Sequence, residues 1–276
     1  MATIQTVGLL GLGKMGNPMA KHLRAGGFAV VGFDPAAAAC DRARTIGVRV
    51  VNSPLEVAQL SQLVLIVVGF DNEVERAVFG RDGIVAGART GLIVAVCSTV
   101  APRYAARLAA RLAERDLSMI DAPLARGEAA AVAGKLLIYG AGDEKSFEAC
   151  RRPLSAFASD IFYLGPAGVG QVGKMVNNMI LWACIAANDE GLRLGQALGA
   201  DSARLREALH HGSAQNWALD NHAGTSGMPW AEKDMNIVLQ EADIVRLSLP
   251  LAGTVKEVIK GLKIRLGYPM PTTPDD

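Results

Sequence analysis

A lysine and an asparagine in the middle of the chain are residue types that can carry out acid–base chemistry on a small molecule. Lys174 and Asn178 lie four positions apart in the stretch GVGQVGKMVNN, so in a helix they share one face, about one turn apart. A lysine partly removed from water has a lowered pKa and can exchange a proton with a substrate hydroxyl, while an asparagine amide can orient the hydroxyl or carbonyl oxygen. The alternative is a lysine that extends to solvent beside an exposed asparagine.

Three glycines near the N-terminus have the spacing of a phosphate-binding turn. Gly11, Gly13 and Gly16 form GxGxxG directly after an apolar run. The first glycine permits a tight turn, the second lets the backbone approach a pyrophosphate, and the third allows a helix to pack closely on a strand. Asp34 follows about 20 residues later, where a carboxylate can accept hydrogen bonds from an adenosine ribose. The alternative is that the glycines only tighten a turn and that Asp34 caps the next helix.

The stretch around Asp34 predicts NAD rather than NADP as the cofactor. A carboxylate repels the 2′-phosphate that distinguishes NADP, and neither Asp34 nor Pro35 offers a cation to bind it. The residues expected to contact the cofactor in this part of the chain are Gly11, Leu12, Gly13, Met15, Gly16, Phe33, Asp34 and Pro35.

The N-terminal part of the chain alternates apolar, strand-like runs with amphipathic helical runs. This alternation is typical of βαβ units and a mostly parallel sheet. We therefore expect a doubly wound, Rossmann-type α/β domain that binds NAD over residues 1–165. The expected strands cover residues 4–9, 29–33, 48–51, 63–68, 92–97, 118–121, 136–139 and 160–163, and one expected helix covers 102–115.

Strand-like runs stop after about residue 165, and helical periodicity replaces them. Asp201 with the serine after it is a good helix N-cap signal. The expected helices are one long apolar helix over 169–198, a second after Asp201, and two more over 230–246 and 250–266. Residues 166–276 are therefore expected to form an all-helical domain for substrate binding and oligomerisation, beginning with a long interdomain helix and ending in a disordered tail, PMPTTPDD.

Composition and charge exclude several classes of protein. The 276 residues are 50% hydrophobic and carry a net charge of +1, which excludes a disordered chain and a nucleic-acid or anionic-membrane partner. Four widely spaced cysteines form no CxxC pair, so no metal site is expected. No apolar run approaches the ~20 residues of a membrane span, and no signal peptide is recognisable. These features predict a soluble, cytoplasmic protein with a small-molecule substrate.

Four motifs, in order along the chain, resemble the β-hydroxyacid dehydrogenase family, related to 3-hydroxyisobutyrate dehydrogenase and tartronate semialdehyde reductase. They are GLGKMGNPMA, DAPLARGEAAAVAGKLLIYGAG, GVGQVGKMVNN and EKDMNIVL, and the resemblance covers nearly the whole chain. The resemblance implies a Rossmann domain, a helical domain that often mediates oligomerisation, and reversible oxidation of a short 3-hydroxy acid to its semialdehyde. It implies Lys174 as the general acid–base, Asn178 as its partner in the site, and a homodimer or homotetramer.

The same resemblance implies further contacts. Lys233, in EKDM, matches a family lysine that reaches the cofactor near the active site, the alternative being a surface Glu-Lys-Asp run. Thr99 matches a position on the nicotinamide side of the cofactor, and Ser98 is expected to meet the substrate, although either hydroxyl could instead cap the following helix. The loop after the fourth strand is expected to contribute Val68, Gly69, Phe70 and Val74 to the cofactor site.

One stretch departs from the family pattern. Where the family has Ser-Gly-Gly for the substrate carboxylate, this chain has Ala125, Arg126 and Gly127, so a hydroxyl is lost and a planar cation appears. A related branch that acts on sulfolactaldehyde looks similar here, so a substrate with a sulfonate, a phosphate or a second carboxylate is one hypothesis. The alternative is that Arg126 points to solvent or pairs with Glu128.

Three functions from different classes follow. The first is an NAD-dependent 3-hydroxyacid dehydrogenase or semialdehyde reductase acting on a small anionic hydroxy acid or aldehyde, with a sulfonated or phosphorylated aldehyde as a variant. The second is an imine reductase, which shares the two-domain plan but usually replaces the catalytic lysine, so Lys174 argues against it. The third is a non-catalytic dinucleotide sensor, which needs the glycines and Asp34 but not Lys174 and Asn178.

Overall fold

The computed structural model describes residues 3–221 and 228–269, and the chain divides into two compact units, Met1–Lys174 and Met175–Asp276. The division lies inside a long helix that starts at residue 169. Nearly all of the final stretch over 269–276, for which a disordered tail is expected, lies outside the described residues.

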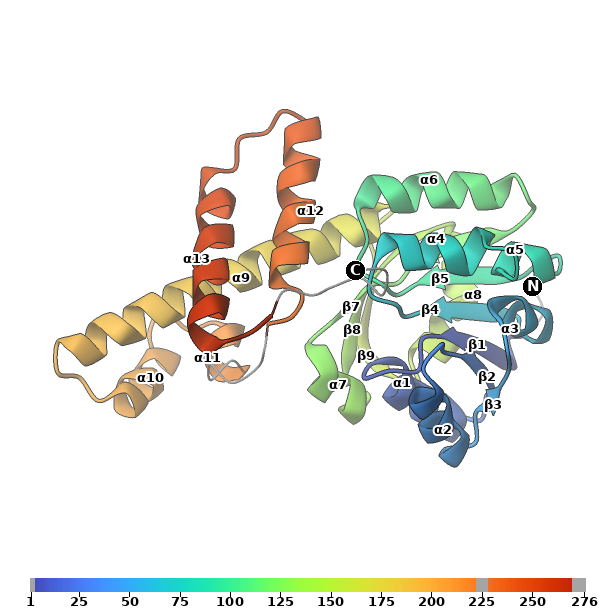
Figure 1. Cartoon of the computed structure of the whole chain (residues 1–276), viewed down its shortest axis with the longest axis horizontal. Helices are drawn as coiled ribbons and strands as arrows, with labels where there is room; N and C mark the ends of the chain where they lie inside the picture. Colours follow the sequence, from blue (N-terminus) through green and yellow to red (C-terminus); the bar gives the residue numbers. More distant parts are fainter. Residues whose placement is uncertain (1–2, 222–227, 270–276) are drawn as a thin grey trace. The chain divides into compact units, whose positions relative to one another are not determined.

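The first unit is built on a nine-stranded sheet. The strands are β1 (Thr6–Leu10), β2 (Ala29–Phe33), β3 (Arg49–Val50), β4 (Leu63–Ile66), β5 (Ile93–Val96), β6 (Ser118–Asp121), β7 (Leu124–Ala125), β8 (Leu136–Gly142) and β9 (Ala158–Tyr163). Their order is β3-β2-β1-β4-β5-β6-β8-β7, with β9 beside β8 (Figure 1). All pairs among β1 to β6 are parallel, and only β8 runs antiparallel to its neighbours β6 and β7. The expected mostly parallel, Rossmann-type sheet is confirmed.

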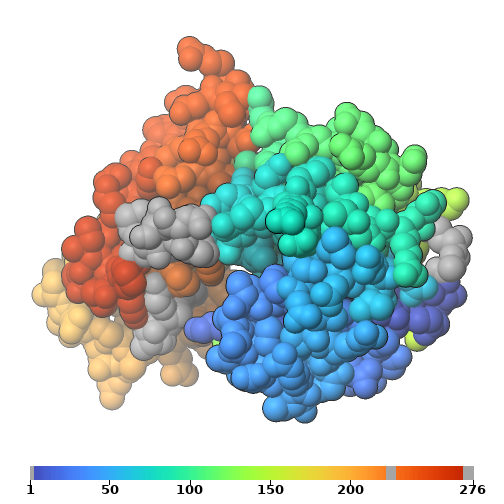
Figure 2. Space-filling model, turned by 45° about the vertical axis from the view of Figure 1, so that its right-hand side comes forward, coloured from blue at the N-terminus to red at the C-terminus, as the bar shows by residue number. Residues whose placement is uncertain are grey.

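Helices cover both faces of this sheet. They are α1 (Gly16–Ala25), α2 (Ala37–Thr45), α3 (Pro54–Leu60), α4 (Asp71–Phe79), α5 (Ile84–Gly87), α6 (Pro102–Ala113), α7 (Gly127–Ala133) and α8 (Glu144–Leu154). One apolar core joins α1, α2, α7 and α8 to one face, and a second joins α3 to α6 to the other. In Figure 2 the surface of this unit is coloured from blue to green, the colours of its residues by number. The central strands β4 and β5 are buried at every position. Burial on both faces explains why these strands are continuous apolar runs.

The structure agrees with most of the expected strands and adds one. β2 and β6 have the expected bounds, and the other expected strands are present with ends that differ by a few residues. β7 was not expected, because a two-residue strand has no readable period and exists only through its antiparallel pairing with β8.

The described part of the second unit, 175–221 and 228–269, is helical, which confirms an all-helical C-terminal region. Its helices are α9 (Val169–Ala197), which begins in the first unit, α10 (Ser202–His210), α11 (Trp217–Asn221), α12 (Ala231–Ile244) and α13 (Pro250–Leu266). The Asp201 carboxylate accepts the backbone N–H of Arg204 at 2.9 Å, as expected of an N-cap. The five-residue α11 was not expected, since it is too short to show helical periodicity.

A buried ion pair joins α12 to α13. The Lys263 ammonium lies 2.5 Å from a carboxylate oxygen of Glu232, and the two side chains are 1% and 6% exposed. Asp234, two residues further along α12, is also buried. The alternative of a surface Glu-Lys-Asp run is therefore wrong for both acids, because α12 turns them into the apolar core that it shares with α13.

We expect Lys263→Met to lower the free energy of unfolding by about 3–5 kcal/mol, because it leaves the Glu232 carboxylate buried without its cation. Urea unfolding measures the effect. The double variant Lys263→Met with Glu232→Leu should recover most of the loss. The control Lys260→Met removes a surface ion pair with Glu257 on the same helix and should change stability by about 1 kcal/mol or less. A loss below about 1 kcal/mol for the single variant would contradict a buried pair.

Candidate active site

Two of the three glycines between β1 and α1 are required by close backbone contacts, and the third leaves an open surface. Gly11 has φ of +96°, and a Cβ there would stand 2.2 Å from the carbonyl oxygen of Val67. A Cβ on Gly16 would stand 1.9 Å from the Gly11 carbonyl oxygen, whereas one on Gly13 would meet no atom within 4 Å. The turn is therefore closed at its two ends and open at Gly13, which fits the approach of a dinucleotide's phosphates to the backbone.

The Asp34 carboxylate is tied to this turn. One of its oxygens accepts the backbone N–H of Leu12 at 2.7 Å, and the other accepts that of Ala36 at 2.8 Å. Asp34 does not cap α2, because the N-cap of that helix is Ala36. Each carboxylate oxygen has a second lone pair, so the geometry leaves acceptor capacity for a ribose hydroxyl. Phe33 is half-buried and Pro35 is exposed beside it.

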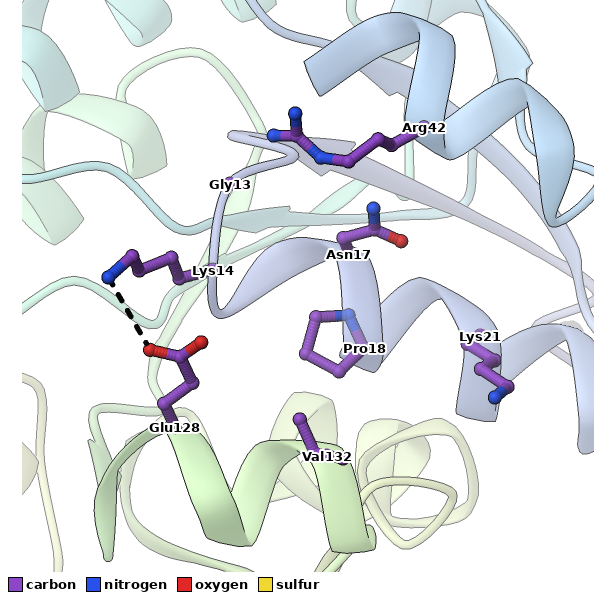
Figure 3. A pocket seen from close by; sticks show the side chains of 8 residues that line it. All are labelled: Gly13, Lys14, Asn17, Pro18, Lys21, Arg42, Glu128 and Val132. Carbon is purple, nitrogen blue, oxygen red and sulfur yellow. Dashed lines mark ion pairs between the residues drawn. The ribbon is translucent and has the colours of Figure 1, made fainter. Parts of the chain in front are cut away.

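A pocket of about 490 Å³ lies on the surface next to the turn (Figure 3). Three of its side chains, Lys14, Lys21 and Arg42, are cationic, and the Lys14 ammonium lies 3.8 Å from the carboxylate of Glu128. The excess of positive charge beside the open Gly13 suits a phosphate group. Sequence reasoning missed Arg42, because this residue reaches the turn from α2 and no local pattern links the two. The pocket is lined by Gly13, Lys14, Asn17, Pro18, Lys21, Arg42, Glu128 and Val132.

The loop after β4 is held by backbone hydrogen bonds to side chains. The Glu73 carboxylate accepts the N–H groups of both Gly69 and Phe70 at 2.9 Å. Val68 donates its N–H to the Ser98 hydroxyl, also at 2.9 Å. Val74, expected to contact the cofactor, is 0% exposed and packs in the core, which leaves it no surface for that contact.

The loop after β5 carries Ser98 and Thr99. Ser98 is 4% exposed, and its hydroxyl accepts from Val68 and donates to the carbonyl of Ile66 at 3.3 Å, so it holds two loops together. Its expected contact with the substrate stays a prediction. Thr99 is half-buried. Neither hydroxyl caps α6, whose N-cap is Ala101.

The start of α9 is fastened to the ends of two strands. Asp121, the last residue of β6, is fully buried, and one carboxylate oxygen accepts the N–H of Gly168 at 2.6 Å and that of Gly170 at 3.2 Å. Gln171 accepts the N–H of Val100 and donates to the carbonyl of Ser98. Lys174 follows on the same helix and is half-buried. Only the tertiary structure shows that Asp121 holds the start of the helix that carries the lysine and that Gln171 links this helix to the loop after β5.

Asn178 lies one turn after Lys174, and its side chain has a defined orientation. Its amide nitrogen donates to the Asp234 carboxylate at 2.7 Å, and its amide oxygen accepts from the side chain of Asn177 at 2.9 Å. The Trp182 indole also donates to Asp234, at 3.1 Å. Asn178 is 5% exposed and belongs to a buried polar cluster, a network that the i, i+4 spacing alone does not reveal.

Lys233 is next to this cluster in sequence, on α12. Its ammonium lies 5.6 Å from the centre of the Trp230 ring, a cation–π distance. The contact of Lys233 with a cofactor, which the family resemblance implies, stays a prediction.

Arg126 occupies a strained position before α7. Its φ is +80°, a left-handed conformation that favours glycine, the residue that the family usually has there. One terminal nitrogen of its guanidinium donates to Asp160 at 2.6 Å, to Ser159 at 3.0 Å and to the carbonyl of Lys135 at 3.2 Å. The alternative of a pair with Glu128 is therefore wrong. Its neighbours Ala125 and Gly127 are a buried residue of β7 and a glycine with φ of +73°.

The structure describes residues 3–221 and 228–269. Within these ranges no helix combines the length and the low polarity that a membrane crossing needs. In the same part of the chain no three His, Cys, Asp or Glu side chains are grouped so that they could hold a metal ion.

Family models cover almost the whole chain. Residues 6–165 match the NAD binding domain of 6-phosphogluconate dehydrogenase, and residues 168–269 match a domain described as NAD-binding of NADP-dependent 3-hydroxyisobutyrate dehydrogenase. With the sheet and the glycine turn described above, these matches define an NAD(P)-dependent oxidoreductase.

Individual relatives narrow the class. An NAD-dependent L-serine dehydrogenase from Pseudomonas aeruginosa is 34% identical over 217 residues, 79% of this chain and 73% of the relative. A 3-hydroxyisobutyrate dehydrogenase from the same organism is 31% identical over 268 residues, 91% and 90% of the two chains. The solved structure of Mycobacterium tuberculosis 3-hydroxyisobutyrate dehydrogenase with L-serine superposes with a TM-score of 0.83 at 26% identity, covering 94% of each chain. The protein belongs to the β-hydroxyacid dehydrogenase family, whose members act on small hydroxy acids.

The burial of Asp121 predicts a pH-dependent stability. Burial raises the pKa of Asp121 from 3.8 to about 6, against the opposing effect of backbone hydrogen bonds from Gly168, Gln171 and Gly170. The folded chain therefore keeps this proton to a higher pH than the unfolded chain does. Ionising Asp121 costs stability as the pH rises from about 4 to 6, by up to about 3 kcal/mol.

We expect the stability of the wild type relative to Asp121→Asn to be greatest below about pH 4 and to fall as the pH rises through 6. Urea unfolding of both proteins at pH 4, 5, 6 and 7 measures this difference. The exposed control Asp82→Asn should show no comparable trend. A difference between wild type and Asp121→Asn that stays constant with pH would show that Asp121 does not titrate in this range.

Proposed function

We propose that the protein is an NAD-dependent 3-hydroxyacid dehydrogenase that interconverts a small 3-hydroxy acid and its semialdehyde, with Lys174 as the general acid–base. The observation that carries the proposal is the oriented amide of Asn178, held by Asp234 and Asn177 one helical turn from Lys174. A non-catalytic dinucleotide sensor has no need of an asparagine fixed in this way beside a lysine.

The residues of the chain have separable tasks in this proposal. Bound NAD supplies the acceptor for the hydride that leaves the hydroxyl-bearing carbon. Lys174 takes the hydroxyl proton during oxidation and returns it during reduction. Asn178 orients the oxygen that gains or loses this proton, and its own position is set by the buried Asp234. The turn at Gly11, Gly13 and Gly16 holds the dinucleotide phosphates.

The substrate class follows from the relatives and from Arg126. One similar protein is an L-serine dehydrogenase, another is a 3-hydroxyisobutyrate dehydrogenase, and the similar solved structure is a 3-hydroxyisobutyrate dehydrogenase with L-serine. Carboxylic 3-hydroxy acids of this size are therefore the proposed substrates. Arg126 is engaged with Asp160, and this ion pair competes with a sulfonate or phosphate group that would need Arg126 as its cation. The pair therefore favours a 3-hydroxy carboxylic acid over a sulfonated or phosphorylated aldehyde.

The first test removes the proposed acid–base. Lys174→Ala should lower kcat by about 10²- to 10⁴-fold, because the hydroxyl proton loses its acceptor, while the Kd for NADH stays within about threefold. Turnover is followed by NADH absorbance with 3-hydroxyisobutyrate, L-serine and related 3-hydroxy acids, and binding by NADH fluorescence. Lys145→Ala, on the exposed side of α8, is the matched control. If the Lys174 variant kept kcat within about tenfold of wild type, Lys174 would not be the acid–base.

The second test concerns the cofactor. We propose NAD rather than NADP because the Asp34 carboxylate stands at the end of β2 beside the glycine turn. Asp34→Asn keeps an acceptor oxygen but removes the charge, so the preference for NADH over NADPH in kcat/KM should fall about tenfold. Asp41→Asn, an exposed site on α2, is the control for loss of a nearby charge. A wild type that uses NADPH better than NADH would overturn the proposed preference.

A further inference from the structure

Gln171 is a fully buried polar side chain in the first turn of α9. Its amide oxygen accepts the backbone N–H of Val100 at 3.2 Å, and its amide nitrogen donates to the backbone carbonyl of Ser98 at 2.9 Å. Since an N–H can only donate and a carbonyl can only accept, these two partners allow one orientation of the amide. Gln171 therefore binds the backbone on both sides of Thr99, although it lies about 70 residues further along the chain.

The loop over residues 98–100, to which Gln171 is hydrogen-bonded, is itself fixed to the central sheet. The Ser98 hydroxyl accepts from Val68 and donates to Ile66, the last residue of β4. One side chain thus links α9 to the carboxyl ends of the neighbouring strands β4 and β5.

A second anchor prevents the start of α9 from moving independently of this link. Asp121 binds the N–H groups of Gly168 and Gly170. The contact between backbones is close, because a Cβ on Gly170 would stand 2.5 Å from the carbonyl oxygen of Tyr139, and one on Gly168 would stand 2.7 Å from that of Pro102. These contacts fix where the helix leaves the sheet, and the two hydrogen bonds of Gln171 tie that position to the loop that carries Thr99.

Lys174 lies three residues after Gln171, so the two share a face of α9 and are neighbours along it. We propose that Gln171 is a positioning residue, which sets the place of Lys174 relative to the loop over residues 98–100. This inference rests on the proposed function, in which Lys174 handles the proton, and on the expectation from the family resemblance that Thr99 lies on the nicotinamide side of the cofactor. A side chain that only filled the core could be apolar, whereas burying an amide is favourable only if both of its hydrogen bonds are made.

The test uses Gln171→Met, which keeps the length of the side chain and removes both hydrogen bonds. Gln196→Met, at an exposed position near the other end of α9, is the matched control. Hydrogen exchange followed by mass spectrometry is measured without cofactor on peptides that cover 98–104 and 166–174. In Gln171→Met we expect both peptides to exchange about tenfold faster together, while a peptide covering β2 is unchanged.

Kinetics give the second readout. Because a small misplacement of a reacting group lowers the rate more than binding, kcat of Gln171→Met should fall by about 10- to 100-fold, with the Kd for NADH within about threefold of wild type. Gln171→Glu gives a rescue. The protonated glutamate can make both hydrogen bonds of the glutamine, whereas the ionised glutamate cannot donate to Ser98. The ratio of its kcat to that of wild type at the same pH should therefore approach one at low pH and fall as the pH rises.

Two results would overturn the proposal: an exchange rate in 98–104 that does not respond to Gln171→Met, or a kcat within about twofold of wild type despite faster exchange in both peptides. If Gln171→Met does not fold, Gln171→Glu decides the same question through the pH dependence of exchange in both peptides. If the wild type turns over no 3-hydroxy acid, the proposed function fails. The exchange experiment then tests separately whether Gln171 links α9 to the loop over residues 98–100. Faster exchange in both peptides of Gln171→Met supports this link, and faster exchange in only one of them overturns it.

Discussion

The rest of the site depends on how the first turn of one helix satisfies its backbone N–H groups inside the protein. The first N–H groups of a helix have no partner within it, and leaving them buried and unpaired is costly. In α9 the Asp121 carboxylate accepts two of these N–H groups, and it also places a negative charge at the positive end of the helix dipole. Because glycines let the backbone come close, the helix starts directly against β6 and β8, and Lys174 stands at a fixed distance along it.

The glycine turn after β1 leads into α1, where the backbone N–H groups at a helix start also need partners. There the backbone is open at Gly13, so that a bound phosphate can approach the start of α1 in the way that the Asp121 carboxylate approaches the start of α9. One helix start is satisfied by the protein and therefore positions a side chain. The other is open beside cationic side chains and therefore suits a ligand.

Much of this arrangement could be predicted from residue patterns. The alternation of apolar runs predicts the parallel sheet, because strands buried on both faces must be apolar throughout, and GxGxxG identifies the turn, because no other residue fits at Gly11 or Gly16. The two-residue β7 and the five-residue α11 were missed, since neither is long enough to have a period. Ser98 and Val74 were expected at the site from their places along the chain, but both are buried, because exposure depends on what packs over a residue.

The sequence by itself determined the fold class, the family, the cofactor class and the spacing of Lys174 and Asn178, because each of these is written in local patterns of residue type. Only the tertiary structure decided what holds those residues in place. Asp121 and Gly168 lie 47 residues apart, Ser98 and Gln171 73, and Asn178 and Asp234 56, so no local pattern joins these partners. The charge of Arg126 is likewise evident from the sequence. Its partner Asp160 is set by the tertiary structure, because Asp160 belongs to β9, which pairs with β8.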